Sequence, residues 1–243
     1  MKRLNFISGA IAALLFSANV LALPFDTPIT TLTFHTVTNN NPGNVTVGQT
    51  QISVQMFDSV GGNSLTDTGV IFRFLNSGPA TSTITQIYFE DGTLLGAPSF
   101  SYPTLGVAYE TGANPANLPG ANNAAPAFVA TATFNSQPTP NVQSGVDPLE
   151  SLDIHFALLA GKDTGDTLFE LSNLAGFGVA PGGLRIGIHV QRLPTGDDNS
   201  EGFVNNLPVV PDPTVPEPTP VWMLGLGLLG LGGYKRRQTK LAA

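Results

Sequence analysis

The sequence predicts a mostly β protein: a single antiparallel β-sandwich, jelly-roll-like, formed by residues 23–206 and carrying one short helix. Apolar side chains recur at every second position in many short segments, as in strands with one buried face. The 27 glycines and 20 prolines, about a fifth of the 243 residues, supply the turns between them. Only 11% of the residues are charged, which favours a loop-rich β protein outside the cytoplasm.

The expected strands follow one another along this body. They are the segments with period-two alternation, at residues 32–34, 52–56, 70–74, 84–89, 128–134, 152–158 and 184–190. Turn-forming residues separate them at 41–43, 61–63, 76–79, 91–92 and 180–183. Each strand is expected to bury one face and to leave the other face polar.

One segment, residues 166–175, favours a helix. Asp166 is a suitable N-cap, and Gly176 is a suitable stop. Three leucines at helical spacing share one face between them: Leu168, Leu171 and Leu174. Residues 113–127, rich in Asn, Pro, Gly and Ala, are expected to form a long surface loop.

The first residues have the three parts of a secretory signal peptide. Lys2 and Arg3 form the positive start, residues 6–16 form a short apolar core, and Ala22 is the small residue at the expected cleavage point. The apolar core is shorter than the roughly 20 residues of a spanning helix, so an uncleaved anchor is the less favoured alternative. We therefore predict a signal peptide over residues 1–22, read by Sec-type export machinery.

The other end combines a proline-rich linker, an apolar segment and a basic stop. Six prolines fall within residues 207–220, which favours an extended chain. Residues 221–234 carry no charge and are followed by Lys235, Arg236 and Arg237. Fourteen residues rise only about 21 Å as a helix, short of a hydrocarbon core of about 30 Å, so a permanent anchor is marginal. The basic residues are expected to stay cytoplasmic, with the body outside.

The triplet Pro216-Glu217-Pro218, the Leu-Gly-rich segment after it and the arginine cluster at 236–237 together resemble the PEP-CTERM sorting signal of Gram-negative bacteria. The resemblance covers about a tenth of the chain. It implies recognition by an exosortase, cleavage near the triplet, transient anchoring in the inner membrane, and delivery to the cell surface or the medium. It also implies a host that makes exopolysaccharide and biofilm matrix. An ordinary single-pass C-terminal anchor is the alternative left open.

The net charge of the body argues against some classes of binding partner. Between the two ends it carries four basic residues against sixteen acidic ones, a formal net charge of −12 against −7 for the whole chain. This balance argues against a nucleic-acid partner, and against anionic polysaccharide unless divalent cations bridge the two. The absence of cysteine excludes disulfides, thiolate zinc sites and a cysteine nucleophile.

Two groups of residues are candidate metal or acid–base sites. Asp153 and His155 share one face of a strand, and with His189 they would form a site if their strands were neighbours. Asp197, Asp198 and Glu201 are candidate calcium ligands in a loop, although none of the carboxylate groups has EF-hand spacing. Polar residues on strand faces and solvated turn charges are the default interpretations.

Exposed aromatic rings are the usual platform for carbohydrate, and the body offers few of them. Tyr102 and Tyr109, which flank a loop, are the candidates for glycan binding. The chain shows no serine-hydrolase elbow, zinc-protease helix or phosphate-cradling loop.

We therefore expect no enzymatic activity and no cofactor, with the sandwich acting as an interaction or structural module; bound calcium is the alternative left open. The alternatives are a glycan-binding module, with or without calcium, and a glycan-active enzyme. The enzyme would require two carboxyl groups about 5 to 10 Å apart in one cleft.

Overall fold

The computed structural model describes residues 27–137, 144–174, 183–195 and 199–208. The predicted signal peptide over 1–22 and the hydrophobic segment with its basic stop at 221–237 lie outside these residues, as does the linker beyond Pro208. Within the described ranges, no helix is both long and apolar enough to cross a membrane.

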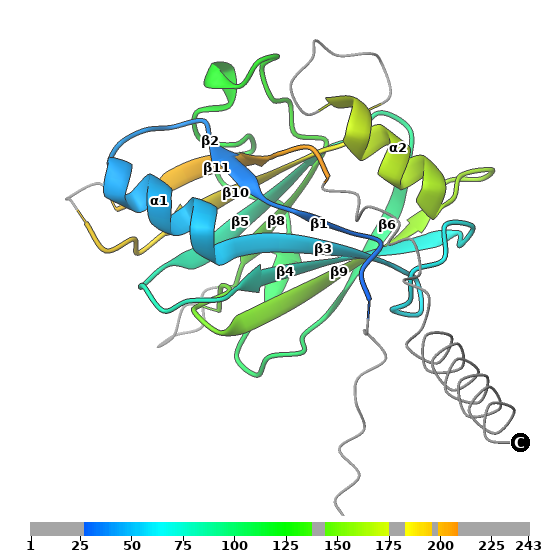
Figure 1. The fold of residues 1–243 in the computed structure, drawn as a ribbon, viewed down its shortest axis with the longest axis horizontal. Helices are drawn as coiled ribbons and strands as arrows, with labels where there is room; N and C mark the ends of the chain where they lie inside the picture. Colours follow the sequence, from blue (N-terminus) through cyan, green and yellow to red (C-terminus); the bar gives the residue numbers. More distant parts are fainter. Residues whose placement is uncertain (1–26, 138–143, 175–182, 196–198, 209–243) are drawn as a thin grey trace, which may run out of the picture.

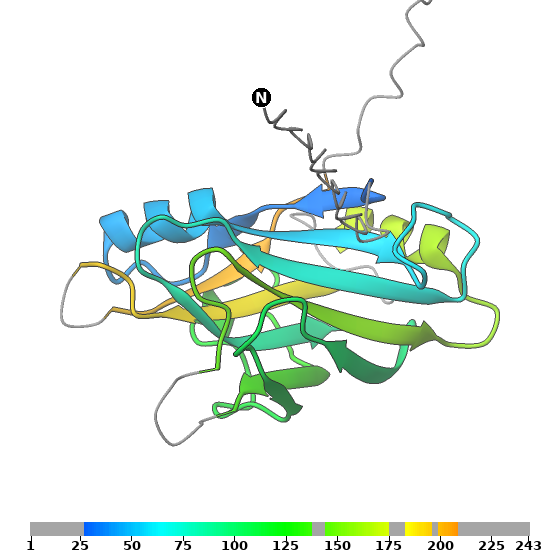
Figure 2. The same cartoon turned by 90° about the horizontal axis from the view of Figure 1, so that it is seen from below.

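The body consists of two antiparallel sheets packed face to face (Figures 1 and 2). The five-stranded sheet has the order β1 (Thr30–Leu32), β3 (Ile52–Asp58), β4 (Gly69–Asn76), β9 (Glu150–Leu158), β6 (Leu95–Ser101). The six-stranded sheet has the order β2 (Phe34–Thr36), β11 (Glu201–Asn205), β10 (Arg185–Gln191), β5 (Thr83–Glu90), β8 (Ala132–Ser136), β7 (Tyr109–Thr111). The mostly β architecture with two antiparallel sheets is confirmed.

The main core lies between the sheets and is rich in phenylalanine. Phe89 of β5 lies at its centre, with its ring centroid 5.3 Å from that of Phe72 and 5.0 Å from that of Phe156. Phe134 of β8 approaches Phe89 edge-on at 5.8 Å. Tilted and edge-to-face contacts are the favoured geometries for aromatic pairs, so these rings join the two sheets as well as filling the space between them.

The segment predicted as one strand at 32–34 is divided between the sheets. Leu32 ends β1 in the five-stranded sheet, and Phe34 begins β2 in the six-stranded sheet. Thr33, between them, accepts a hydrogen bond from the backbone N–H of Asn206. One continuous segment therefore supplies an edge strand to each sheet and closes that side of the sandwich.

The prediction of a single helix is wrong, because the described residues also form α1 (Pro42–Gln51) where a turn at 41–43 was expected. The Asn41 side chain caps this helix by accepting from the N–H of Gly43, and Pro42 occupies the first turn. Gly48 lies against the ring of Phe203, so that a Cβ there would come within 2.2 Å of the ring. The glycine thus allows the helix to pack closely over β11.

The predicted helix at 166–175 is present as α2 (Thr164–Leu174), but its cap differs from the one expected. Asp163 accepts from the N–H of Asp166 at 2.9 Å, and the Asp166 carboxylate accepts from the N–H of Asp163 at 3.1 Å. This reciprocal arrangement is a capping box with Asp163 at its N-terminal position. The expected stop at Gly176 lies outside the described residues.

The predicted strand at 128–134 begins later than expected, because β8 starts at Ala132. Phe128 instead packs with Tyr88 and Leu118 in a second apolar cluster on the outer face of the six-stranded sheet. The long loop expected at 113–127 covers this face and contains a short 3₁₀ helix, Ala121–Asn123. β6, β7 and β11 were not predicted.

Candidate functional site

The outer face of the five-stranded sheet carries a buried ion pair. Arg73 on β4 and Asp153 on β9 are register partners, and the Arg73 guanidinium donates to both carboxylate oxygens of Asp153 at 2.7 and 2.8 Å. Asp153 is 1% exposed. The guanidinium also lies 5.6 Å from the ring centroid of Phe57, which anchors it from the side of β3.

A serine and a histidine extend this pair toward the edge of the sheet. Ser101 on β6 donates to Asp153 at 3.4 Å, and its hydroxyl lies 2.9 Å from Nε2 of His155. Burial lowers the pKa of His155, and the Arg73 charge lowers it further, whereas Asp153 raises it. The imidazole is therefore neutral at pH 7 and has both a donor and an acceptor nitrogen to offer.

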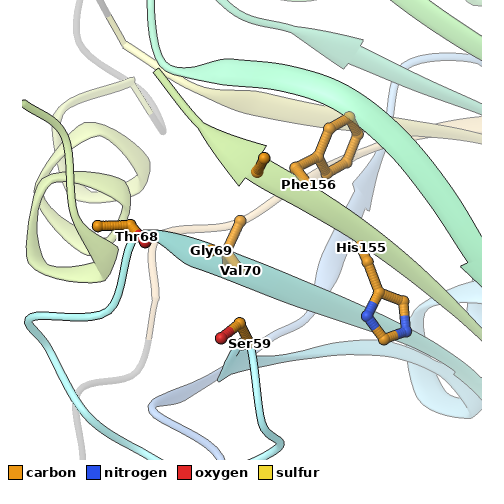
Figure 3. Close-up of a pocket in the computed structure, with 7 residues that line it drawn as sticks. Ser59, Thr68, Gly69, Val70, His155 and Phe156 are labelled. Atoms are coloured by element: carbon orange, nitrogen blue, oxygen red, sulfur yellow. The ribbon is translucent and has the colours of Figure 1, made fainter. Parts of the chain in front are cut away.

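A hollow of about 310 Å³ lies beside His155 on this sheet (Figure 3). Gly69 and Ala157 are register partners, so two adjoining positions carry almost no side chain. Ser59 and Thr68 complete its polar wall. The Ser59 hydroxyl is held by the Asp67 carboxylate at 2.8 and 2.9 Å, which fixes one side of the hollow.

The candidate trio of Asp153, His155 and His189 is not brought together. Asp153 and His155 lie on β9 of the five-stranded sheet, whereas His189 lies on β10 of the other sheet. Nδ1 of His189 lies 2.8 Å from Oε1 of Gln86, and burial lowers the pKa of His189 to about 4. The condition that the two strands be neighbours is therefore not met.

Of the candidate calcium ligands, only Glu201 lies within the described residues; Asp197 and Asp198 fall outside them. Glu201 is in β11 rather than in a loop and is 1% exposed. Its carboxylate accepts from the Thr38 hydroxyl and from the backbone N–H groups of Asn40 and Asn41. The described ranges contain no group of three His, Asp or Glu side chains placed to hold a metal ion.

The two candidate tyrosines have different environments. Tyr109 is 2% exposed and donates its hydroxyl hydrogen to the carbonyl of Ile84; burial raises its pKa. Tyr102 is 42% exposed and stacks on Phe100 with an interplanar angle of 10°. The Tyr102 hydroxyl donates to the carbonyl of Tyr109 at 3.1 Å. Tyr102 thus connects the end of β6 to β7 and keeps part of its ring exposed. Tyr109, in contrast, is part of the buried core.

The family model of the PEP-CTERM protein-sorting motif matches residues 214–237. The chain carries a PEP-CTERM sorting motif at its C-terminal end. The match includes every residue predicted for the sorting signal, namely Pro216, Glu217, Pro218, Lys235, Arg236 and Arg237. These residues lie outside those that the structure describes. No curated protein and no solved structure matches the chain with significant similarity.

Ser59, Gly69 and Ser101 were not predicted from the sequence as members of a surface site. One signal was available: Arg73 shares its strand face with the apolar Ile71 and Leu75, which favours an acidic partner on a neighbouring strand. The contacts of Ser101 and the hollow depend on the register of β4, β6 and β9, for which the sequence carries no local signal.

Proposed function

We propose that this PEP-CTERM protein is exported, anchored transiently in the inner membrane, processed by an exosortase, and retained at the cell surface or in the biofilm matrix. The observation that carries the proposal is the sorting motif at residues 214–237, close after the last described residue, Pro208. In this proposal the signal peptide over 1–22 directs export, and the proline-rich linker holds the triplet at 216–218 accessible to the enzyme.

The sandwich acts in this proposal as a non-catalytic interaction or structural module. The contacts of several of its carboxylates support this role. Asp153 is paired with Arg73, and Glu90 is paired with Arg185. Glu201 accepts backbone N–H groups next to α1. These acidic groups hold strands and loops together, and a rigid, acidic surface module is the simplest use of such a body.

The sorting part of the proposal is tested by proline substitutions in the linker. Pro216→Ala/Pro218→Ala alters the triplet, and Pro211→Ala/Pro213→Ala removes two prolines from the same linker while leaving the triplet intact. We expect the first variant to accumulate in the membrane fraction as unprocessed precursor, and the second to be processed like the unaltered chain. Equal processing of both variants would contradict recognition at the triplet.

A second candidate function, binding of neutral glycan, is favoured by the open ring of Tyr102 stacked on Phe100. Tyr102→Ala removes the ring and the hydroxyl, whereas Tyr102→Phe removes only the hydroxyl that links the ring to Tyr109. Stacking on the ring predicts that titration with neutral oligosaccharides loses its signal in the Ala variant and keeps it in the Phe variant. Loss in both variants, or in neither, would contradict a stacking site at Tyr102.

A further inference from the structure

Both described ends of the chain leave the sandwich toward the loop between β3 and β4, residues 59–68. β1 begins opposite Met56, at the close of β3. β11 runs antiparallel to β2, and the N–H of Asn206 then bonds to Thr33, so the chain leaves β11 travelling toward the start of β1. We call this end of the sandwich the hairpin end; Figure 1 shows its loops beside α2.

The hairpin end exposes large apolar side chains. Val60 is 73% exposed and Leu65 is 46% exposed in the β3–β4 loop, and Phe169 on α2 is 65% exposed. The loop and the helix are in direct contact, because the N–H of Gly165 donates to the carbonyl of Leu65 at 2.9 Å. Gly165 and Phe169 are four residues apart and share one face of α2. We call these three apolar residues the hairpin-end patch.

The loops that display the patch are held firmly. The Asp58 carboxylate accepts from the backbone N–H groups of Val60, Gly62 and Ser64. The Thr164 hydroxyl donates to the carbonyl of Ser64 at 2.7 Å, which ties the start of α2 to the same loop. The apolar side chains are thus presented on a rigid support, which reduces the entropy lost when they contact a surface.

The length of chain beyond Pro208 indicates what covers this patch. Twelve residues, 209–220, separate it from the apolar segment at 221–234, and even as extended polyproline they span only about 37 Å. While that segment is in the bilayer, the hairpin end is held close to the lipid surface. Exposed Phe, Leu and Val side chains gain free energy by entering the interfacial region of a bilayer.

We infer that the hairpin-end patch of the precursor rests on the headgroup region of the membrane that holds its C-terminal segment. This inference depends on the proposed transient anchoring. Asp67 lies at the end of the same loop, and Asp163 and Asp166 lie at the start of α2, with Lys162 as a nearby cation. The charge balance favours zwitterionic over anionic headgroups, since like charges repel at the surface. Release of the body after processing would end the contact.

The test uses the full chain, whose lack of cysteine allows single labels. Leu65→Cys and Phe169→Cys place an environment-sensitive fluorophore on the patch, and Leu149→Cys places it on an 82% exposed leucine next to Asn76, at the opposite end of β4. The proteins are reconstituted with phosphatidylcholine vesicles, with and without nitroxide-labelled lipid. We expect a blue shift and nitroxide quenching at 65 and 169, neither of them at 149, and weaker effects when phosphatidylglycerol is added.

Three outcomes would overturn the inference. If the chain floats with vesicles but labels at 65 and 169 behave like the label at 149, the anchoring stands and the contact of the patch fails. If the chain does not float with vesicles, the proposed anchoring fails and the inference fails with it. A blue shift that appears without lipid and grows with protein concentration would show that a second copy of the chain covers the patch instead.

Discussion

Arg73 and Asp153 face each other across β4 and β9 and form a two-bond ion pair on the outer side of the five-stranded sheet, with Asp153 almost completely buried. The pair joins the two strands that also wall the hollow beside His155. Removing either partner alone leaves the other with an uncompensated charge in a site of low water access.

Arg73→Met is therefore expected to lower the free energy of unfolding by about 3 kcal/mol, because it leaves the buried Asp153 carboxylate without its ion-pair partner. The double variant Arg73→Met/Asp153→Leu is expected to recover part of that loss, since an apolar pair needs no ion partner. Urea unfolding of the two variants checks the prediction. A double variant that is less stable than Arg73→Met would contradict it.

We expect His189 to make the free energy of unfolding depend on pH. Burial lowers its pKa in the folded protein to about 4, while an unfolded histidine titrates near 6.5. The unfolded chain therefore takes up the proton first as the pH falls, and up to about 3 kcal/mol of stability is lost between pH 6.5 and 4. His189→Gln, which keeps an N–H donor for Gln86, is expected to flatten this slope in denaturant titrations. An unchanged slope would assign the dependence to other groups.

Glu170 is expected to make stability depend on pH in the opposite direction. Its Oε1 accepts from Lys162 at 3.2 Å, but its Oε2 is buried without a hydrogen-bond partner, and burial raises the pKa of the carboxyl. The ionised form therefore costs stability as the pH rises through the folded pKa. We expect Glu170→Gln to raise the free energy of unfolding at pH 8 by about 1 kcal/mol and Lys162→Met to lower it. A less stable Glu170→Gln protein would show that the ion pair outweighs the burial cost.

Gly48 tests the packing of α1. Replacing a helical glycine by alanine ordinarily stabilises a helix by up to about 1 kcal/mol. At Gly48 the added Cβ would lie 2.2 Å from the ring of Phe203, so we expect Gly48→Ala to lower the melting temperature. Gly43→Ala in the same helix meets only side-chain atoms at 3.2 Å or more and serves as the control. A raised melting temperature for Gly48→Ala would contradict the close packing of α1 on β11.

The strands that the sequence predicted are those in which alternation is complete within one segment, such as β4 and β9. α1 was missed because its residues, Pro42–Gln51, carry no apolar stripe, and it is placed by its Asn41 cap and by contact of Gly48 with Phe203. β11 was missed because Glu201 was interpreted as a loop acid, although tertiary donors satisfy its carboxylate. In both cases the element is stabilised by contacts with residues far away in the sequence, which a local pattern does not show.

The sorting motif and the surface site on the five-stranded sheet also differ in whether their residues are local in the sequence. The sorting motif is contiguous, so it could be recognised from the sequence alone, and the family model matches the same segment. The Ser101–His155 contact joins residues 54 positions apart, and the hollow at Gly69 and Ala157 exists only in the register of β4 with β9. Tyr102 and Tyr109 are close in the sequence, but only the fold decides which ring is open.

The proposed function depends on export of the chain and on its cleavage at the sorting signal. The intact mass of the protein recovered from the medium and the cell envelope, in hosts with and without the exosortase, tests it most directly. We predict a species beginning near Leu23 and ending near Pro216–Pro218, found outside the cell only when the enzyme is present. A membrane-bound species that retains Lys235–Ala243 in both hosts would contradict the claim and indicate an ordinary C-terminal anchor.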